Sequence, residues 1–313
     1  MPDHELSIYE YIAGAVVEGA LPDDFNLDEF EQERGQIRMA DGAWDGIAIY
    51  HMASPDLPGD IDERIGNVVD LASAGAYERA DEACSSLVDE FRAIAIIDQV
   101  EGYVHAHARE IDAEALFHYA MRTLLLSRDV ELLKIGFELL EVFGEPDDEV
   151  KDVARLLGLS DEFAIFAVFN MMDWHDGNQE VFELAKKVRG WGRIHAIAKL
   201  EPETAEIRDW LFFEGVDNEV VPAYSALECY EKSGFASRMK QPLNAREFTA
   251  AGTIVDTLLD EGPVPGISAL DDSQGALQAY IGHAAQHDLD LDDLYTVFHI
   301  RAYADHEGFG KTA

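Results

Sequence analysis

The sequence predicts an all-α protein. Its helix pairs are expected to stack as an α-solenoid between a less regular N-terminal segment and a C-terminal helical cap. Apolar residues recur at helical spacing through most of the 313 residues. Between Tyr77 and Phe235 almost no segment alternates apolar and polar residues as a strand does. One helix of each expected pair starts near Val130, Glu162, Gly192 or Glu219. The intervals between these starts are about 32, 30 and 27 residues, which is the period of a helix-pair repeat.

Residues 1–60 form the less regular segment. Apolar positions within residues 5–19 fall on one face of a helix. The pattern of residues 37–50 is ambiguous, because a strand could begin at Ile47 while two Asp-Gly steps are equally consistent with turns. The sequence therefore predicts one helix here and leaves the rest of the segment open.

Residues 61–235 are expected to form the repeat array. The segments 130–140 and 163–172 are apolar on most sides, which is typical of helices covered all round. They are assigned to an inner layer, and the more charged segments 147–157 and 179–188 are assigned to an outer layer. A globular all-α bundle whose helix spacing is accidental is the alternative.

Polar residues mark the expected helix boundaries. A helix is expected to start after Asp60 or Asp62 and to stop at Gly75. Asp112 lies where a later helix is expected to begin, and two further residues are expected to be N-caps: Ser160, Asp217.

Residues 236–313 are assigned to the C-terminal cap, because the helical rhythm changes after Ser233. A helix is expected over 245–260, followed by a connector rich in proline and glycine. Two last helices, about 273–287 and 291–303, are expected to close the chain.

The chain carries 23 Lys and Arg against 63 Asp and Glu, a formal net charge of −40. Binding to nucleic-acid phosphates or to an anionic membrane needs clustered basic residues, and the few bases here are scattered. The sequence therefore predicts neither partner. Adaptation to high salt is the preferred interpretation of the acidic surface, and ordinary solubility is the alternative.

The two cysteines, Cys84 and Cys229, lie far apart within apolar segments and are interpreted as small buried residues. No apolar run approaches the 18 residues that a membrane-spanning helix needs. The first residues lack the basic and apolar pattern of a secretory leader. A cytoplasmic location is expected.

The helix-pair pattern of residues 77–235 resembles that of the HEAT/armadillo class of α-solenoids. The run Gly190-Trp-Gly-Arg-Ile-His-Ala196, followed by 200–202 and 206–210, resembles a feature of uncharacterised bacterial and archaeal proteins. The charge favours a haloarchaeal type among them. The solenoid resemblance implies binding of proteins or peptides along a curved surface, without a cofactor.

Partner binding is assigned to Trp191, Arg193 and His195, because arginine and tryptophan are common anchors of protein interfaces. The alternative is a structural role, in which the adjacent glycines permit close helix approach. Catalysis, if present, is assigned to Asp41, Asp45 and His51, since carboxylates four residues apart can do acid–base work when a cleft holds them.

No metal site is expected, and the residues that come nearest to one fall in two places. His107 and Glu110 begin a histidine and carboxylate stripe that the helix start at Asp112 is expected to interrupt. Asp173 and His175 lie in a segment that has the composition of a turn between helices.

The sequence is compatible with two functions. The first is a non-catalytic scaffold whose groove binds a basic or salt-adapted protein or peptide. The second is an enzyme that acts on a small molecule where the segment around Asp41, Asp45 and His51 meets the repeat of Arg193 and His195.

Overall fold

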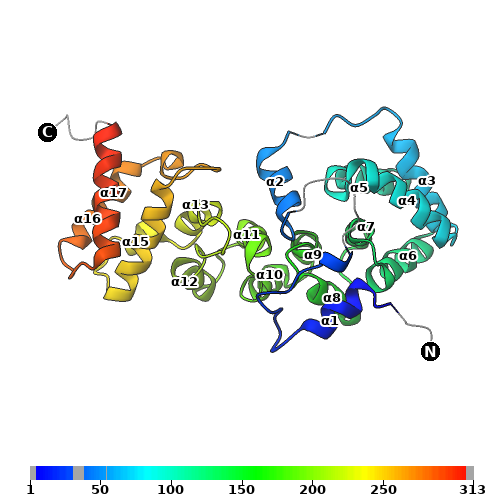
Figure 1. Ribbon diagram of the computed structural model, residues 1–313, viewed down its shortest axis with the longest axis horizontal. Helices are drawn as coiled ribbons and strands as arrows, with labels where there is room; N and C mark the ends of the chain where they lie inside the picture. Colours follow the sequence, from blue (N-terminus) through cyan, green and yellow to red (C-terminus); the bar gives the residue numbers. More distant parts are fainter. Residues whose placement is uncertain (1–4, 31–38, 54, 308–313) are drawn as a thin grey trace. The chain divides into compact units, whose positions relative to one another are not determined.

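The structure, a computed structural model, describes residues 5–30, 39–53 and 55–307. Ile37, Arg38, Ser54 and the N-terminal residues 1–4, on which parts of the sequence predictions fall, lie outside these ranges. The described chain is all-α, with seventeen α-helices, no β-strand and 67% helical content. It divides into two compact units, residues 1–196 and 197–313 (Figure 1). The sequence predicted divisions at residues 60 and 235.

The first unit is organised around pairs of packed helices. The chain runs through α3 (Ile61–Ser73), α4 (Tyr77–Phe91), α5 (Ile97–His107), α6 (Ala113–Leu126), α7 (Val130–Glu141), α8 (Asp148–Leu157), α9 (Ala164–Met172) and α10 (Gly177–Ala185). Helices α3, α6 and α8 contact one another in succession, and α4, α7 and α9 do the same. These two sets of helices form two rows. Helix α5 contacts α3 of one row and α7 of the other, so it lies against both rows and belongs to neither (Figure 1).

Helix α7 lies in the middle of the first unit, in contact with α4, α5, α6 and α9 (Figure 1). All ten residues from Glu131 to Leu140 are buried, which confirms that this helix is covered all round. Three of the ten are charged: Glu131, Lys134 and Glu138. Charged residues are rarely buried unless they are paired, so they indicate a specialised interior.

The N-terminal segment contains two α-helices. Helix α1 (Ile8–Ala15) begins with a capping box, in which the Ser7 hydroxyl accepts from the Glu10 amide and the Glu10 carboxylate accepts from the Ser7 amide. Helix α2 (Ala43–His51) occupies most of the region where the sequence suggested a strand or turns. The strand was wrong, the Asp41-Gly42 step is a turn as suggested, and the Asp45-Gly46 step lies inside the helix. Its local pattern is weak, and its helical form is decided by tertiary contacts of Asp45 and Gly46, both of which are buried.

Helix boundaries follow the expected caps in part. The Asp112 carboxylate accepts from the backbone amides of residues 114 and 115 and so caps α6 as predicted. Two predicted N-caps were wrong, because α9 begins only after Phe163 rather than Ser160, and α13 (Ala223–Lys232) after Pro222 rather than Asp217. A turn that the local pattern does not reveal precedes each of these helices.

The second unit is arranged around α15 (Ala245–Leu259), which contacts four other helices: α12 (Ala205–Phe213), α13, α16 (Ser273–Ala284) and α17 (Leu291–Glu307). A short helix α14 (Phe235–Arg238) follows Ser233, where the helical rhythm was expected to change. Helix α11 (Gly190–Lys199) spans the boundary between the units.

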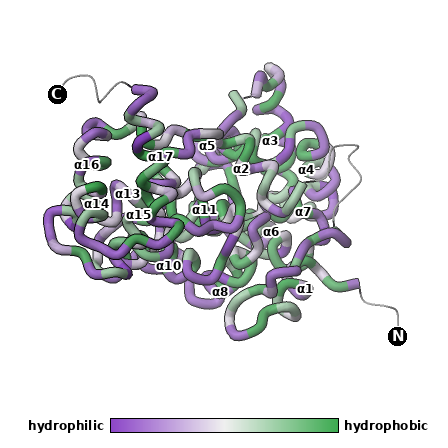
Figure 2. Tube along the Cα trace, turned by 60° about the vertical axis from the view of Figure 1, so that its left-hand side comes forward, coloured by the Kyte–Doolittle hydropathy of each residue, from purple (hydrophilic) through white to green (hydrophobic). Residues whose placement is uncertain are grey.

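Both cysteines, Cys84 and Cys229, are buried, and neither forms a disulfide. Within the described residues no helix combines the length and the apolar character that crossing a bilayer requires. Hydrophilic positions recur throughout the described residues, in agreement with a charge that is distributed along the sequence rather than gathered in one tail (Figure 2).

Candidate functional site

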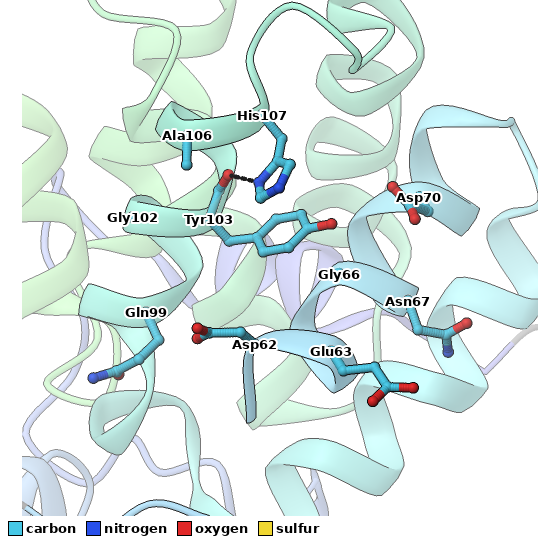
Figure 3. Close-up of a pocket in the computed structure, with 10 residues that line it drawn as sticks. All are labelled: Asp62, Glu63, Gly66, Asn67, Asp70, Gln99, Gly102, Tyr103, Ala106 and His107. Carbon is cyan, nitrogen blue, oxygen red and sulfur yellow. Dashed lines mark hydrogen bonds between the residues drawn. The ribbon is translucent and has the colours of Figure 1, made fainter. Parts of the chain in front are cut away.

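An open groove of about 720 Å³ runs between α3 and α5 in the first unit. Ten residues line it: Asp62, Glu63, Gly66, Asn67, Asp70, Gln99, Gly102, Tyr103, Ala106, His107. Three of them are carboxylates and none is lysine or arginine. The groove is therefore acidic, with an aromatic floor supplied by α5 (Figure 3).

Helix α3 presents its carboxylates at helical spacing. Asp62, Gly66 and Asp70 are four residues apart, so they lie on one face of the helix. Gly66 makes room for the aromatic ring of α5, because a Cβ atom there would lie 2.6 Å from the Tyr103 hydroxyl. Figure 3 shows the Tyr103 ring extending from α5 toward α3, with Asp62 and Asp70 on either side of it.

Helix α5 contributes a stacked pair of rings. Tyr103 and His107 are one turn apart, and their ring centroids lie 4.0 Å apart with planes 21° from parallel. His107 Nδ1 lies 2.9 Å from the Tyr103 carbonyl oxygen. Because a carbonyl only accepts, we assign the hydrogen to Nδ1, which leaves Nε2 of the neutral ring as an acceptor.

The groove offers mainly hydrogen-bond acceptors and negative charge. No described base forms an ion pair with Asp62, Glu63 or Asp70, and all three are exposed. Burial, followed by the charges of Asp70 and Glu110, raises the pKa of Tyr103, so its hydroxyl remains protonated. The arrangement fits a cationic donor such as guanidinium or ammonium, which can pair with the carboxylates and lie over the rings.

The residues that came nearest to a metal site lie at the end of α5 and in the turn between α9 and α10. Helix α5 ends at His107 and α6 begins at Ala113, so the stripe that Glu110 would continue is interrupted. Asp173 and His175 are exposed in the turn between α9 and α10, and the His175 amide donates to Glu145 Oε2 at 3.1 Å. Across the described ranges, no three His, Cys, Asp or Glu residues are grouped as metal ligands would be.

A second place in the first unit joins the two other groups of sequence-predicted residues. Helix α2 packs on the start of α11, where Gly46 faces Trp191 so closely that a Cβ atom would overlap the indole. The Tyr50 ring is nearly parallel to His195, with centroids 6.1 Å apart. The segment that contains Asp45 therefore lies against the helix that carries Arg193 and His195.

The α2 contact is anchored by a buried cluster of charges. Lys134 Nζ lies 2.6 Å from Asp45 Oδ2, 3.1 Å from Glu131 Oε1 and 2.5 Å from Glu162 Oε1. The Lys134 side chain is fully buried, Asp45 and Glu131 are each 1% exposed, and Glu162 is 15% exposed. The other Glu162 oxygen accepts from the Gly42 amide at 2.6 Å. One lysine therefore ties α2 to α7 and to the turn before α9.

The cluster holds more negative than positive charge, and the pKa values reflect this. Burial, partly offset by Lys134, raises the pKa of Asp45 to about 7. Although burial opposes it, the attraction of Lys134 and the amide of Ala93 lower the pKa of Glu131. The three carboxylates raise the pKa of Lys134 against the effect of burial, so the amine stays charged. Asp45 is the member that titrates near neutrality.

Asp161 holds the start of α11 in place. Its carboxylate accepts from the Trp191 amide at 3.2 Å and from the Gly192 amide at 3.1 Å. Burial raises the pKa of Asp161 to about 7, although these two hydrogen bonds act in the opposite direction. The backbone of the Gly-Trp-Gly run is thus fixed by a carboxylate that the sequence analysis did not single out.

The remaining sequence-predicted residues lie around this contact in different settings. Asp41 Oδ2 accepts from the Leu27 amide at 3.2 Å, Arg193 is half-buried and His51 is exposed. His195 is only 3% exposed, and burial lowers its pKa to about 4, so the ring is neutral. Asp45 and His195 face the interior, and their contacts hold α2 against the rest of the unit.

Lys134, Glu131 and Glu162 were not predicted from the sequence. The sequence did contain a pattern that indicates Lys134 and Glu131. A helix that is apolar on most sides must be buried, and charged residues within it must then be paired. Asp62 and Tyr103 were not predicted either, because their proximity depends on how α5 lies against α3 and no local pattern in the sequence indicates it.

Comparison with known protein families, curated proteins and solved structures finds no match. Any function assigned to the protein therefore rests on the residues of this chain alone.

Acidification from pH 8.5 to 6.5 should raise the free energy of unfolding by about 4 kcal/mol. Burial raises the pKa of Asp45 and Asp161 to about 7 and that of Glu138 to about 9, well above the unfolded values. The native state therefore takes up protons in this window and the unfolded state does not. His195 opposes the trend, and its effect grows as the pH falls toward and below its unfolded pKa of about 6.5, because the unfolded state then takes up a proton that the buried ring does not.

Urea unfolding in 2 M KCl measures this effect, since the salt screens the general repulsion between surface carboxylates. Asp45→Asn should reduce the slope of stability against pH, because it removes one of the three titrating groups. A stability that falls between pH 8.5 and 6.5 would show that these carboxyls are ionised in the native protein.

Proposed function

We propose that the protein is a non-catalytic helical scaffold that binds a basic peptide segment of another protein in the groove between α3 and α5. The observation that supports this is the composition of the groove: three exposed carboxylates without a described basic partner, beside a stacked tyrosine and histidine. Such a surface favours arginine and lysine side chains and disfavours anions.

The dimensions of the groove favour an extended segment with two spaced cations. Asp62 and Asp70 are eight residues apart on α3, which is about 12 Å along a helix axis. In an extended peptide, side chains four residues apart lie on the same face at a separation of about 13 Å. A segment with arginine at positions i and i+4 therefore matches the two carboxylates, and the chain between them lies over Tyr103.

A repeat array of the solenoid kind is part of the proposal. It is supported by the two rows of successive contacts, α3–α6–α8 and α4–α7–α9, in the first unit. It is also supported by helix starts at residues 130, 164, 190 and 223, which keep a spacing close to that of helix-pair repeats. In such arrays a groove along stacked helices is a common place for peptides to bind.

An enzyme at the contact between α2 and α11 has weaker support. Asp45 and His195 are buried there, and the carboxylate of Asp45 is engaged by Lys134. A catalytic acid or base needs access to its substrate, and these side chains instead join parts of the fold.

The proposal predicts that the fluorescent peptide acetyl-Gly-Arg-Ala-Ala-Ala-Arg-Gly-amide binds the full chain. The double variant Asp62→Asn with Asp70→Asn should weaken binding by about tenfold, because each partly exposed ion pair contributes up to about 1 kcal/mol. Fluorescence anisotropy at 0.15 M KCl measures the dissociation constants.

The matched control is Glu78→Gln with Glu82→Gln, which removes the same charge from exposed positions of the neighbouring helix α4. This control should leave the affinity within about twofold, and a peptide with citrulline in place of arginine should not bind. Equal weakening by both double variants would show that the peptide responds to overall charge and not to the groove.

A further inference from the structure

Helix α17 of the second unit carries an apolar stripe on its exposed side. Leu291, Leu294, Tyr295 and Phe298 follow the spacing i, i+3, i+4 and i+7, so they lie on one face. Leu291, Tyr295 and Phe298 are 83%, 63% and 64% exposed, and Leu294 is also exposed. Single exposed apolar residues are ordinary, whereas a contiguous row of large ones is typical of an interaction surface.

The stripe is separate from the face with which α17 packs on its own unit. The buried residues of α17 are Asp293, Thr296 and Ile300, and the helix contacts α15 and α16. Packing within the unit therefore engages a different face from the apolar stripe. One side of the helix packs into the core of the second unit, and the apolar stripe lies on another side that is exposed.

The surroundings of the stripe are acidic. Asp288, Asp290, Asp292 and Asp305 are exposed before, beside and after it. The single arginine of the helix, Arg301, has its Nε atom 3.9 Å from Asp305. The surface is thus an apolar stripe with a negatively charged border.

We propose that this stripe is the docking site for an amphipathic helix of a partner protein, whose apolar face is flanked by lysine or arginine. The apolar stripe can pack against a partner helix that lies along it and has leucine-like side chains at matching i, i+3, i+4 and i+7 positions. The acidic border determines the sign of the flanking charges. The stripe from Leu291 to Phe298 covers about two turns, or about 10 Å, so a short helix suffices.

Charge complementarity favours such a partner over a second copy of this chain. Two copies paired through α17 would bring their acidic borders together, and each chain has a formal net charge of −40. Like charges placed opposite each other at an interface are unfavourable, whereas a basic border on the partner is favourable. This surface lies in the second unit, and the proposal is independent of peptide binding in the α3–α5 groove.

The test uses the full chain and a synthetic 15-residue helix with leucine at i, i+3, i+4 and i+7 and lysine at the remaining positions. We expect binding at 0.15 M KCl, and a loss of about tenfold or more in the double variant Leu291→Ser with Phe298→Ser. Both residues are exposed, so circular dichroism and the urea midpoint should match those of the wild-type protein.

Two controls separate the stripe from general attraction. Val17→Ser with Leu126→Ser removes two exposed apolar side chains elsewhere and should leave binding unchanged. The same peptide with glutamate in place of lysine should not bind. The groove variant Asp62→Asn with Asp70→Asn should bind the helix normally, so the two proposals can fail independently.

Several outcomes would overturn the proposal. Equal affinity of the lysine peptide for the wild-type protein and the Leu291→Ser, Phe298→Ser variant would show attraction to acid alone. Absence of binding by the wild-type protein would remove the site. A dimer seen in sedimentation equilibrium, and abolished by the same double variant, would assign the stripe to a second copy of the chain.

Discussion

Replacing Lys134 with methionine should lower the free energy of unfolding by about 3–5 kcal/mol, measured by urea denaturation at pH 7.5. Methionine has a similar length and suits an apolar interior, so the loss would come from charge and not from a cavity. The substitution leaves Asp45, Glu131 and Glu162 close together without the cation that they share. Buried carboxylates without a counter-charge must either take up protons or separate.

A rescue experiment and a surface control make the Lys134 result specific. Combining Lys134→Met with Asp45→Asn and Glu131→Gln should restore part of the stability, because fewer buried charges then lack a partner. Lys151→Met removes a lysine that contacts the partly exposed Glu145 at 2.6 Å, and should cost about 1 kcal/mol or less. If Lys134→Met and Lys151→Met were equally mild, the buried cluster would not anchor α2.

Replacing Trp191 with alanine should lower the free energy of unfolding by about 3–5 kcal/mol, as is common for a large buried aromatic side chain. Trp191 is buried where α2 crosses the start of α11, and its indole fills the space left by Gly46. The variant would leave a cavity between these elements. Urea denaturation and near-ultraviolet circular dichroism would follow the loss of stability and of fixed aromatic packing.

A double-mutant cycle tests whether Gly46 and Trp191 act as a pair. Gly46→Ala should destabilise the wild-type protein by about 1–3 kcal/mol, because its methyl group overlaps the indole. In the Trp191→Ala background the same change should be nearly neutral. Gly14→Ala is the control, since a Cβ atom there meets nothing within 4 Å. Additive effects of the two substitutions would contradict direct packing between them.

The class of fold could be predicted from the sequence because helical periodicity is a local property. The segment from Val130 to Leu140 shows how far this extends: its apolar character predicted a helix covered on all sides, and α7 is such a helix. Helix α2 shows the limit of prediction from local periodicity. Its nine residues have little amphipathic pattern, and Lys134 and Trp191, which hold it, are 89 and 145 positions away from Asp45 and Gly46.

The candidate groove was beyond prediction for a related reason. Asp62 and Tyr103 are ordinary residues of two amphipathic helices, and nothing near either one indicates that they line the same cavity. Gly66 was the available clue, because a glycine in the middle of a helix often marks a close approach by another residue. Identifying Tyr103 as that residue requires the packing of α5 on α3.

The most direct test of the proposed function is an NMR titration of the full, deuterated chain with the two-arginine peptide. Binding in the groove should shift the amide resonances of residues 62–70 on α3 and 99–107 on α5, and leave those of α17 unchanged. Saturable shifts confined to these two helices are the result expected. Shifts spread over acidic positions throughout the chain, or no shifts at millimolar peptide, would contradict the proposal that this groove binds a basic segment.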